Sequence, residues 1–146
     1  MKAVIQRVKK AKVLVNKKVV TQIASGFLVF LGIAHNDTEK ELDWLVKKIV
    51  NLRIMSDEQG KMNKSLKETD GEMLLVSQFT LYGDCTKGNR PSFVKAAEPK
   101  KAERLYNLFI SKTKSLGVKV KSGIFKAMME VELVNDGPVT LIVDRE

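Results

Sequence analysis

The sequence has very few of the side chains that metal sites and hydrolytic active sites usually employ. It contains one cysteine, Cys85, and one histidine, His35. A single cysteine cannot form a disulfide within the chain, and the two residues together are too few for a structural zinc site. We therefore expect neither a bound metal ion nor another cofactor.

The same scarcity limits the catalytic mechanisms that the chain can use. Ser-His-Asp and Cys-His sites need an imidazole beside the nucleophile, and His35 is the only candidate. Its place at the end of an apolar segment is more typical of a structural or exposed histidine. The glycine-containing stretch 83–88 lacks the closing Lys-Ser or Lys-Thr pair of a phosphate-binding loop. An enzyme with this sequence would need unconventional catalytic groups.

Long apolar runs are also missing. Residues 1–8 carry Gln6 and Arg7 within a short apolar pattern, unlike the continuous apolar core of a signal peptide or membrane helix. The composition is 44% hydrophobic and 29% charged, as in ordinary globular proteins, and 146 residues suffice for one core. We expect a single domain, residues 1–146, that is cytoplasmic and does not bind membranes.

Basic residues, in contrast, are abundant. The chain has 26 lysines and arginines against 17 acidic residues, which gives a formal net charge of +9. Such a charge attracts polyanions, and its spread along the chain favours contacts with a nucleic-acid backbone over base reading by one helix. One hypothesis is therefore a non-catalytic barrel module that binds tRNA or ribosomal RNA. DNA is not expected as a partner.

Apolar periodicity predicts an α+β fold. Strands are expected at residues 3–8, 12–15, 19–23, 27–34, 72–82, 118–121, 124–134 and 139–143. Helical spacing follows the N-cap candidates Asn36, Asp37 and Thr38 up to Leu52, and again from Pro99 to the stop at Gly117. Because most strands can pair with neighbours through short turns, we predict a mainly antiparallel, barrel-like sheet with two packed helices.

Two segments contain side chains suited to a substrate site. In SQFT, residues 77–80, strand alternation places Gln78 and Thr80 on one face and Ser77 on the other. NDGPVT, residues 135–140, lies between the last two predicted strands, and its Gly-Pro bond can be cis at modest cost. Taken singly, the first is typical of a barrel strand and the second of an ordinary turn.

In combination these segments resemble the D-aminoacyl-tRNA deacylase family. The matching strings are SQFTLYGDCTKGNRPSF and VNDGPVT, with AVIQRVKKAKVLV at the start and GKMNKSL in the middle, so the match covers essentially the whole chain. The resemblance implies a β-barrel-like fold and a two-fold homodimer with active sites at the subunit interface. It also implies hydrolysis of the ester that links a D-amino acid to the 3′-terminal adenosine of tRNA.

The resemblance assigns the catalytic positions to the first segment. Ser77, Gln78, Phe79 and Thr80 match the motif that holds the terminal adenosine and the aminoacyl group. Since no base is evident, it implies that a ribose hydroxyl of the RNA assists hydrolysis. The backbone N–H groups near Phe79 and Thr80 would then face the oxyanion. Direct attack by Thr80 is the alternative, and it would require a base.

Chiral selection is assigned to the second segment. Gly137 and Pro138 match a cis dipeptide that enters the neighbouring subunit's site, and Arg7 matches a residue that supports it. Two rigid carbonyl groups there would hold the substrate's amino group and exclude an L side chain by steric clash. Achiral glycine, mischarged on tRNA, has no side chain to clash and is expected to be accepted.

One segment departs from the family pattern. Where the family reads aromatic-Gly-Ala-acid-Met, this chain has Phe125-Lys126-Ala127-Met128-Met129. Phe125, Ala127 and Met129 are kept and are expected to bind substrate. Lys126 and Met128 break the pattern, and we expect them to change how the end of the tRNA is held.

Overall fold

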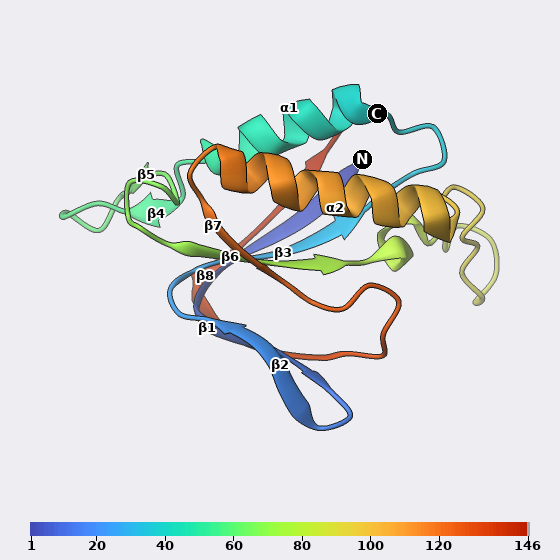
Figure 1. Cartoon of the computed structure of the whole chain (residues 1–146), viewed down its shortest axis with the longest axis horizontal. Helices are drawn as coiled ribbons and strands as arrows, with labels where there is room; N and C mark the ends of the chain where they lie inside the picture. Colours follow the sequence, from blue (N-terminus) through green and yellow to red (C-terminus); the bar gives the residue numbers. More distant parts are fainter. Residues whose placement is uncertain (146) are drawn as a thin grey trace.

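The structure, a computed structural model, describes residues 1–145 (Figure 1). The strands are β1 (Lys2–Val15), β2 (Lys18–Ile23), β3 (Gly26–Gly32), β4 (Met55–Ser56), β5 (Met62–Lys64), β6 (Glu72–Ser77), β7 (Lys119–Ser122) and β8 (Glu130–Asp144). The helices are α1 (Glu39–Val50), α2 (Pro99–Ser115) and the 3-10 helix η1 (Phe79–Tyr82). Figure 1 shows α1 and α2 across one side of the sheet. No helix among the described residues is long and apolar enough to cross a membrane.

β1 organises the main sheet. β8 runs antiparallel along one edge of β1 over nearly its whole length. On the other edge β3 pairs with the first half of β1 and β2 with the second half, both antiparallel. Residues 3–8 and 12–15, predicted as two strands, form the single strand β1, and a short turn joins it to β2.

The remaining strands make the sheet mixed. β6 pairs with β3, and β7 pairs with β6, both in parallel. The chain passes through α1 between β3 and β6 and through α2 between β6 and β7, which are the crossovers that parallel neighbours need. The sheet is therefore mixed: the predicted antiparallel arrangement holds for the pairings of β1 but not for those of β6, and the two packed helices and the barrel-like curvature are as expected.

Apolar side chains fill both faces of the sheet. The larger cluster lies between the sheet and the helices and includes Ile5, Phe27, Leu45, Ile49 and Phe109. The smaller cluster lies on the opposite face and includes Val8, Val13, Leu28, Leu74 and Val76. Because β3 contributes to both clusters, it is the doubly buried strand that its continuous apolar run predicts.

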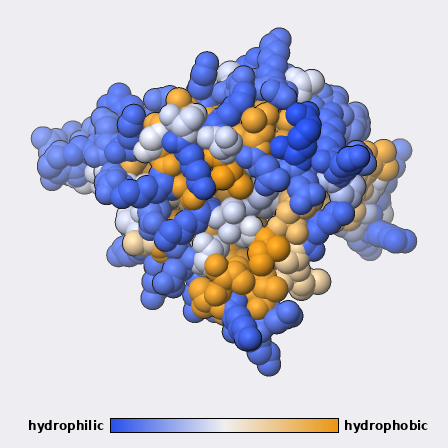
Figure 2. Space-filling view, viewed as in Figure 1, coloured by the Kyte–Doolittle hydropathy of each residue, from blue (hydrophilic) through white to orange (hydrophobic). Residues whose placement is uncertain are grey.

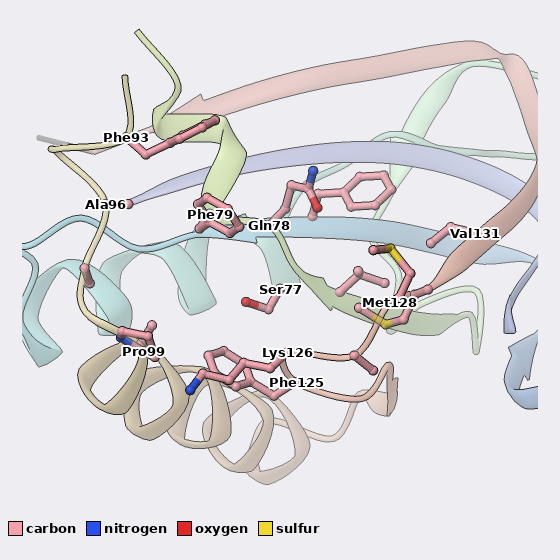
Figure 3. Close-up of a pocket in the computed structure, with 16 residues that line it drawn as sticks. Ser77, Gln78, Phe79, Phe93, Ala96, Pro99, Phe125, Lys126, Met128 and Val131 are labelled. Atoms are coloured by element: carbon pink, nitrogen blue, oxygen red, sulfur yellow. The ribbon is translucent and has the colours of Figure 1, made fainter. Parts of the chain in front are cut away.

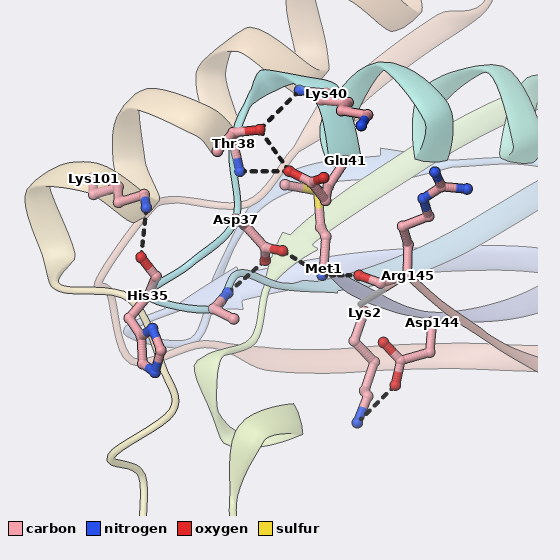
Figure 4. A network of polar contacts seen from close by, with 11 residues as sticks. Met1, Lys2, His35, Asp37, Thr38, Lys40, Glu41, Lys101, Asp144 and Arg145 are labelled. Atoms are coloured by element: carbon pink, nitrogen blue, oxygen red, sulfur yellow. Dashed lines mark hydrogen bonds and ion pairs between the residues drawn. The ribbon is translucent and has the colours of Figure 1, made fainter.

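The first residue is anchored inside the fold (Figure 4). Met1 is 1% exposed, and its ammonium group donates hydrogen bonds to Asp37 Oδ1 and to the Arg145 carbonyl, each at 2.6 Å. The other carboxylate oxygen of Asp37 accepts from Ala34 N at 2.7 Å. A buried charge is stable only when it is paired and hydrogen-bonded in this way. The network joins the start of β1, the loop before α1 and the end of β8.

Three predicted elements need correction. β6 ends at Ser77, and residues 79–82 are a 3-10 helix instead of the end of a strand. Residues 124–129 form a loop before β8 instead of the start of a strand. Residues 135–138 do not separate two strands, because β8 continues through them beside β1, and the pairing register shifts near Val8. Each segment has strand or turn propensity, but its tertiary contacts decide its conformation.

Candidate active site

A cavity of about 700 Å³ opens between the end of β6, the loop before α2 and the segment that leads into β8 (Figure 3). Ser77, Gln78 and Phe79 line it from one side, and residues 125–129 line it from another. We call it the Ser77 cavity. Figure 2 shows apolar side chains gathered below the helices, on a face that is otherwise mostly hydrophilic.

The turn after β6 brings the SQFT residues to this cavity. Gln78 N still donates to Leu31 O at 2.9 Å, as a strand residue would, and the chain then enters η1. Ser77 and Gln78 both line the cavity at the end of the strand, and because residues 79–82 form η1, strand alternation does not extend to Thr80. Thr80 does not line the cavity, but its hydroxyl accepts a hydrogen bond from Gln78 Nε2.

Gly32 makes this turn possible. A Cβ at Gly32 would lie 3.0 Å from Leu81 Cβ and 3.2 Å from Gln78 O. A side chain there would push η1 away from the end of β3, so the shape of the SQFT turn depends on this glycine. Its position at the end of an apolar strand did not distinguish it in the sequence.

An aromatic pair forms one wall of the Ser77 cavity. Phe79 meets Phe93 edge to face, with ring centroids 5.1 Å apart and an interplanar angle of 69°. Phe93 comes from the loop between η1 and α2, which the Asp84–Ser92 bridge closes. Sequence reasoning did not single out Phe93, which stands only as one letter in the string that resembles the family.

The opposite wall comes from the segment that departs from the family pattern. Phe125, Ala127 and Met129 all line the cavity, as do Lys126 and Met128. The Phe125 ring packs on the Tyr106 ring, with the ring centroids 5.8 Å apart. Burial raises the pKa of Tyr106 to about 12, so its hydroxyl stays protonated and donates to Leu75 O at 2.8 Å. Tyr106 therefore provides a fixed surface against which the Phe125 ring packs.

The segment of residues 135–140, which we call the Gly-Pro segment, has its own hydrogen-bond network. The peptide bond between Gly137 and Pro138 is cis, and both residues are exposed. Asn135 accepts from Val139 N at 2.9 Å through its side-chain oxygen and donates to Thr140 Oγ1 at 2.8 Å. Asn135 therefore spans the segment from within and holds its two ends together.

Arg7 also holds the Gly-Pro segment in place, through a hydrogen bond to its backbone. It is only 8% exposed, and its Nε donates to the Asp136 carbonyl at 3.1 Å. Its Nη1 donates to Ile54 O at 2.8 Å and to Ser56 Oγ at 3.3 Å. The guanidinium group thereby joins the Gly-Pro segment to β4, and the contacts to Ile54 and Ser56 were not anticipated from the sequence.

The structure brings together two sets of predicted residues but keeps the sets apart within one chain. Ser77, Gln78 and Phe79 share the Ser77 cavity with residues 125–129, and Arg7 lies against the Gly-Pro segment. None of the described residues 135–140 lines the Ser77 cavity. One chain therefore holds an apolar cavity and, separately, an exposed rigid dipeptide.

Comparison with known proteins decides the family. The model of the D-Tyr-tRNA(Tyr) deacylase family matches residues 4–144. The chain belongs to this family. It is 61% identical over 144 residues to the D-aminoacyl-tRNA deacylase of Desulfatibacillum aliphaticivorans, with 99% of each chain covered.

Two solved structures have a similar fold. The chain is similar to a c-Myc DNA unwinding element binding protein with a TM-score of 0.96 and 43% identity, covering 100% of this chain and 99% of that chain. A probable eukaryotic D-amino acid tRNA deacylase matches with a TM-score of 0.85 and 19% identity, covering 99% and 98%. This second likeness shows that the fold is shared.

Proposed function

We propose that the chain, as one domain, hydrolyses the ester bond of D-aminoacyl-tRNA and releases the free D-amino acid and tRNA. The observation that carries this proposal is membership of the deacylase family over residues 4–144. The formal net charge of +9 suits an RNA substrate. Because aminoacyl-tRNA is a cytoplasmic molecule, we propose that the reaction takes place in the cytoplasm.

The walls of the Ser77 cavity suit the end of such a substrate. Phe79, Phe93 and Phe125 offer flat apolar surfaces against which an adenine base or an aminoacyl side chain can pack. Ser77 and Gln78 add polar groups beside them. We assign binding of the terminal adenosine and the aminoacyl group to this cavity, with Ala127 and Met129 as further contacts.

Backbone N–H groups are the proposed oxyanion donors. The first backbone hydrogen bond of η1 runs from Leu81 N to Gln78 O at 3.3 Å. The N–H groups of Phe79 and Thr80 precede it, so they are not used within the helix and can stabilise a developing negative charge. The ribose hydroxyl beside the ester would assist the attacking water. Thr80, whose hydroxyl already accepts from Gln78, is assigned a positioning role.

The separation of the Gly-Pro segment from the cavity supports a shared site. We propose a two-fold homodimer in which Gly137 and Pro138 of each subunit enter the Ser77 cavity of the partner. Apolar exposure along β8, including Ile142 at 71%, fits an interface on this strand. The rigid dipeptide would reject L-aminoacyl esters by clash and accept glycyl esters, which have no side chain to clash.

The direct test compares D-Tyr-tRNA with L-Tyr-tRNA as substrates for the purified chain. The proposal expects release of D-tyrosine well above the spontaneous rate and no comparable release of L-tyrosine. Binding of tRNA without any acceleration would instead support the non-catalytic RNA-binding module.

Mixing two variants of reduced activity tests the shared site. Gly137→Ala damages the dipeptide and Gln78→Ala damages the cavity, so a mixed dimer would hold one intact site. Activity should partly return when the subunits exchange. Demonstrated exchange without any recovery would contradict the shared-site arrangement.

A further inference from the structure

Lys126 is the only charged residue among the described residues that line the Ser77 cavity. The other lining residues are apolar or neutral, so a single positive charge stands beside an otherwise uncharged cavity. Figure 3 shows Lys126 with Phe125 on the wall that faces Phe79 and Phe93.

The ammonium group of Lys126 has no partner within residues 1–145. Other lysines of the same sheet region are paired, since Lys121 contacts Glu72 at 3.2 Å and Lys119 contacts Asp70 at 2.8 Å. The charge of Lys126 is therefore not used to hold the fold together and is available for a ligand.

The backbone at this position does not favour lysine. Lys126 has a φ of +64°, in the left-handed region where glycine is the least strained residue. A glycine would fit this loop better, and Lys126 makes no contact that compensates through an ion pair. What lysine adds over glycine here is its positive charge and its reach.

The chemistry of the substrate determines what such a charge can contact. This step rests on the proposed function. The adenine, the ribose and the ester of an aminoacyl-tRNA end are uncharged, and its amino group is not anionic. The nearest anion is the phosphodiester on the 5′ side of the terminal adenosine. This group is bonded directly to the nucleoside that the cavity would hold.

We propose that Lys126 binds this terminal phosphodiester and sets affinity for the RNA end without taking part in the chemical step. A lysine ammonium group binds phosphate as a compact point charge, and such contacts position a nucleic acid without reading its sequence. Lys126 is thus a substrate-positioning residue that distinguishes a nucleotide from a nucleoside.

Kinetics on D-Tyr-tRNA give the first readout. Lys126→Gly removes the charge and suits the backbone, so KM should rise about fivefold while kcat stays unchanged. The slope of log(kcat/KM) against log[salt] should become shallower by about 0.7, the value for one phosphate contact on single-stranded RNA. Lys126→Arg keeps the charge and should retain most of the affinity.

Lys17 provides a matched control. It is exposed, has a φ of +63° in the turn between β1 and β2, and does not line the cavity. Lys17→Gly removes the same charge and relieves the same backbone conformation, so its KM and salt slope should match the wild type. An equal effect of Lys17→Gly and Lys126→Gly would show that only the overall charge matters, which overturns the proposal.

Binding of small probes separates this inference from the proposed function. Wild-type protein should bind adenosine 5′-monophosphate more tightly than adenosine, and Lys126→Gly should lose that preference while Lys17→Gly keeps it. If D-Tyr-tRNA is hydrolysed but Lys126→Gly behaves as wild type in both assays, the role of Lys126 is wrong and the deacylase function stands. If no hydrolysis occurs, the function fails, and the probe titrations alone decide whether Lys126 binds phosphate.

Discussion

The Ser77 cavity and the Gly-Pro segment are built in opposite ways. The cavity is assembled from the ends of elements, and its walls are held by apolar and aromatic packing, as between Phe79 and Phe93. The Gly-Pro segment lies inside the long strand β8 and is fixed by directed hydrogen bonds from Asn135 and Arg7.

This difference predicts which of the two regions should tolerate substitutions. Packed apolar walls adjust to small changes of volume, whereas a hydrogen-bonded turn has one geometry that satisfies all its donors and acceptors. The proposed roles of the two regions, binding of D-aminoacyl groups in the cavity and rejection of L side chains by the dipeptide, need these two properties. Substitutions should therefore have graded effects in the cavity and severe effects in the Gly-Pro segment.

The largest effect is expected for Gly137→Ala. The added Cβ would lie 2.8 Å from Val139 Cγ2 and 3.0 Å from Arg7 Nη2, at a φ of +126° that L residues rarely adopt. Displacement of the segment by about 1 Å should lower kcat/KM for D-Tyr-tRNA by about 100-fold. Steady-state hydrolysis measures this loss, and circular dichroism checks that the fold survives.

Gly60 supplies the control for that substitution. It also has a positive φ, +77°, but nothing lies within 4 Å of the added Cβ. Gly60→Ala should cost about 1 kcal/mol of stability from backbone strain and leave activity unchanged. A similar loss of activity in both variants would mean that the Gly-Pro segment has no special sensitivity.

Arg7→Lys should have the next largest effect. Lysine keeps the charge but lacks the planar fork that reaches both Asp136 O and Ile54 O. The loss of one charged hydrogen bond in a buried site should lower the free energy of unfolding by about 1.5 to 3 kcal/mol, measured by urea denaturation. Activity should fall with it, because the dipeptide loses its support.

Ser56→Ala tests whether that loss is specific. The Ser56 hydroxyl accepts a hydrogen bond from Arg7 at 3.3 Å, which is the longest of the three that the Arg7 side chain donates. Its removal should cost less than about 1 kcal/mol. If Ser56→Ala destabilises as much as Arg7→Lys, the support of the segment does not depend on the fork geometry of Arg7.

The two regions also differ in how far the sequence predicts them. Periodicity located both helices and β3, because Leu42, Leu45 and Ile49, among others, repeat at the spacing of a packed helix face. The same reasoning failed after Ser77, where alternating apolar residues look like a strand but the backbone turns against Gly32. Periodicity reports burial along an element and does not report where a distant glycine allows the chain to turn.

The Gly-Pro segment shows a second limit of sequence reasoning. Its residues have ordinary turn chemistry, which predicts a reversal between two strands. In the structure Asn135 satisfies Val139 N, and Arg7 satisfies Asp136 O, so the segment can protrude while β8 continues along β1. Such long-range partners are invisible to local propensity, and only the family resemblance pointed to residues 137 and 138.

A smaller effect is expected in the cavity wall for Phe93→Ala. Phe93 is 39% exposed and pairs edge to face with Phe79, a contact of about 0.5 to 1.5 kcal/mol. KM for D-Tyr-tRNA should rise about two- to tenfold with little change in kcat. Val94, 83% exposed and outside the cavity lining, is the control, and Val94→Ala should match the wild type.

The smallest effect is expected for Thr80→Ala, and it bears directly on how the cavity performs hydrolysis. Thr80 lies outside the cavity lining, and its hydroxyl already accepts a hydrogen bond from Gln78. Direct attack by this hydroxyl would require a base to remove its proton. If backbone N–H groups and the RNA ribose supply the chemistry, the variant should lose only its positioning of Gln78, so kcat should fall by about fivefold or less. A covalent mechanism through Thr80 would instead lower kcat by about 10⁴-fold or more, since the variant lacks the attacking oxygen. Single-turnover hydrolysis measures the chemical step, and mass spectrometry of the wild-type protein after rapid quenching would detect an aminoacyl ester on Thr80. Finding that ester, or a loss of the larger size with the fold intact, would make Thr80 the nucleophile and give the cavity the same intolerance to substitution as the Gly-Pro segment.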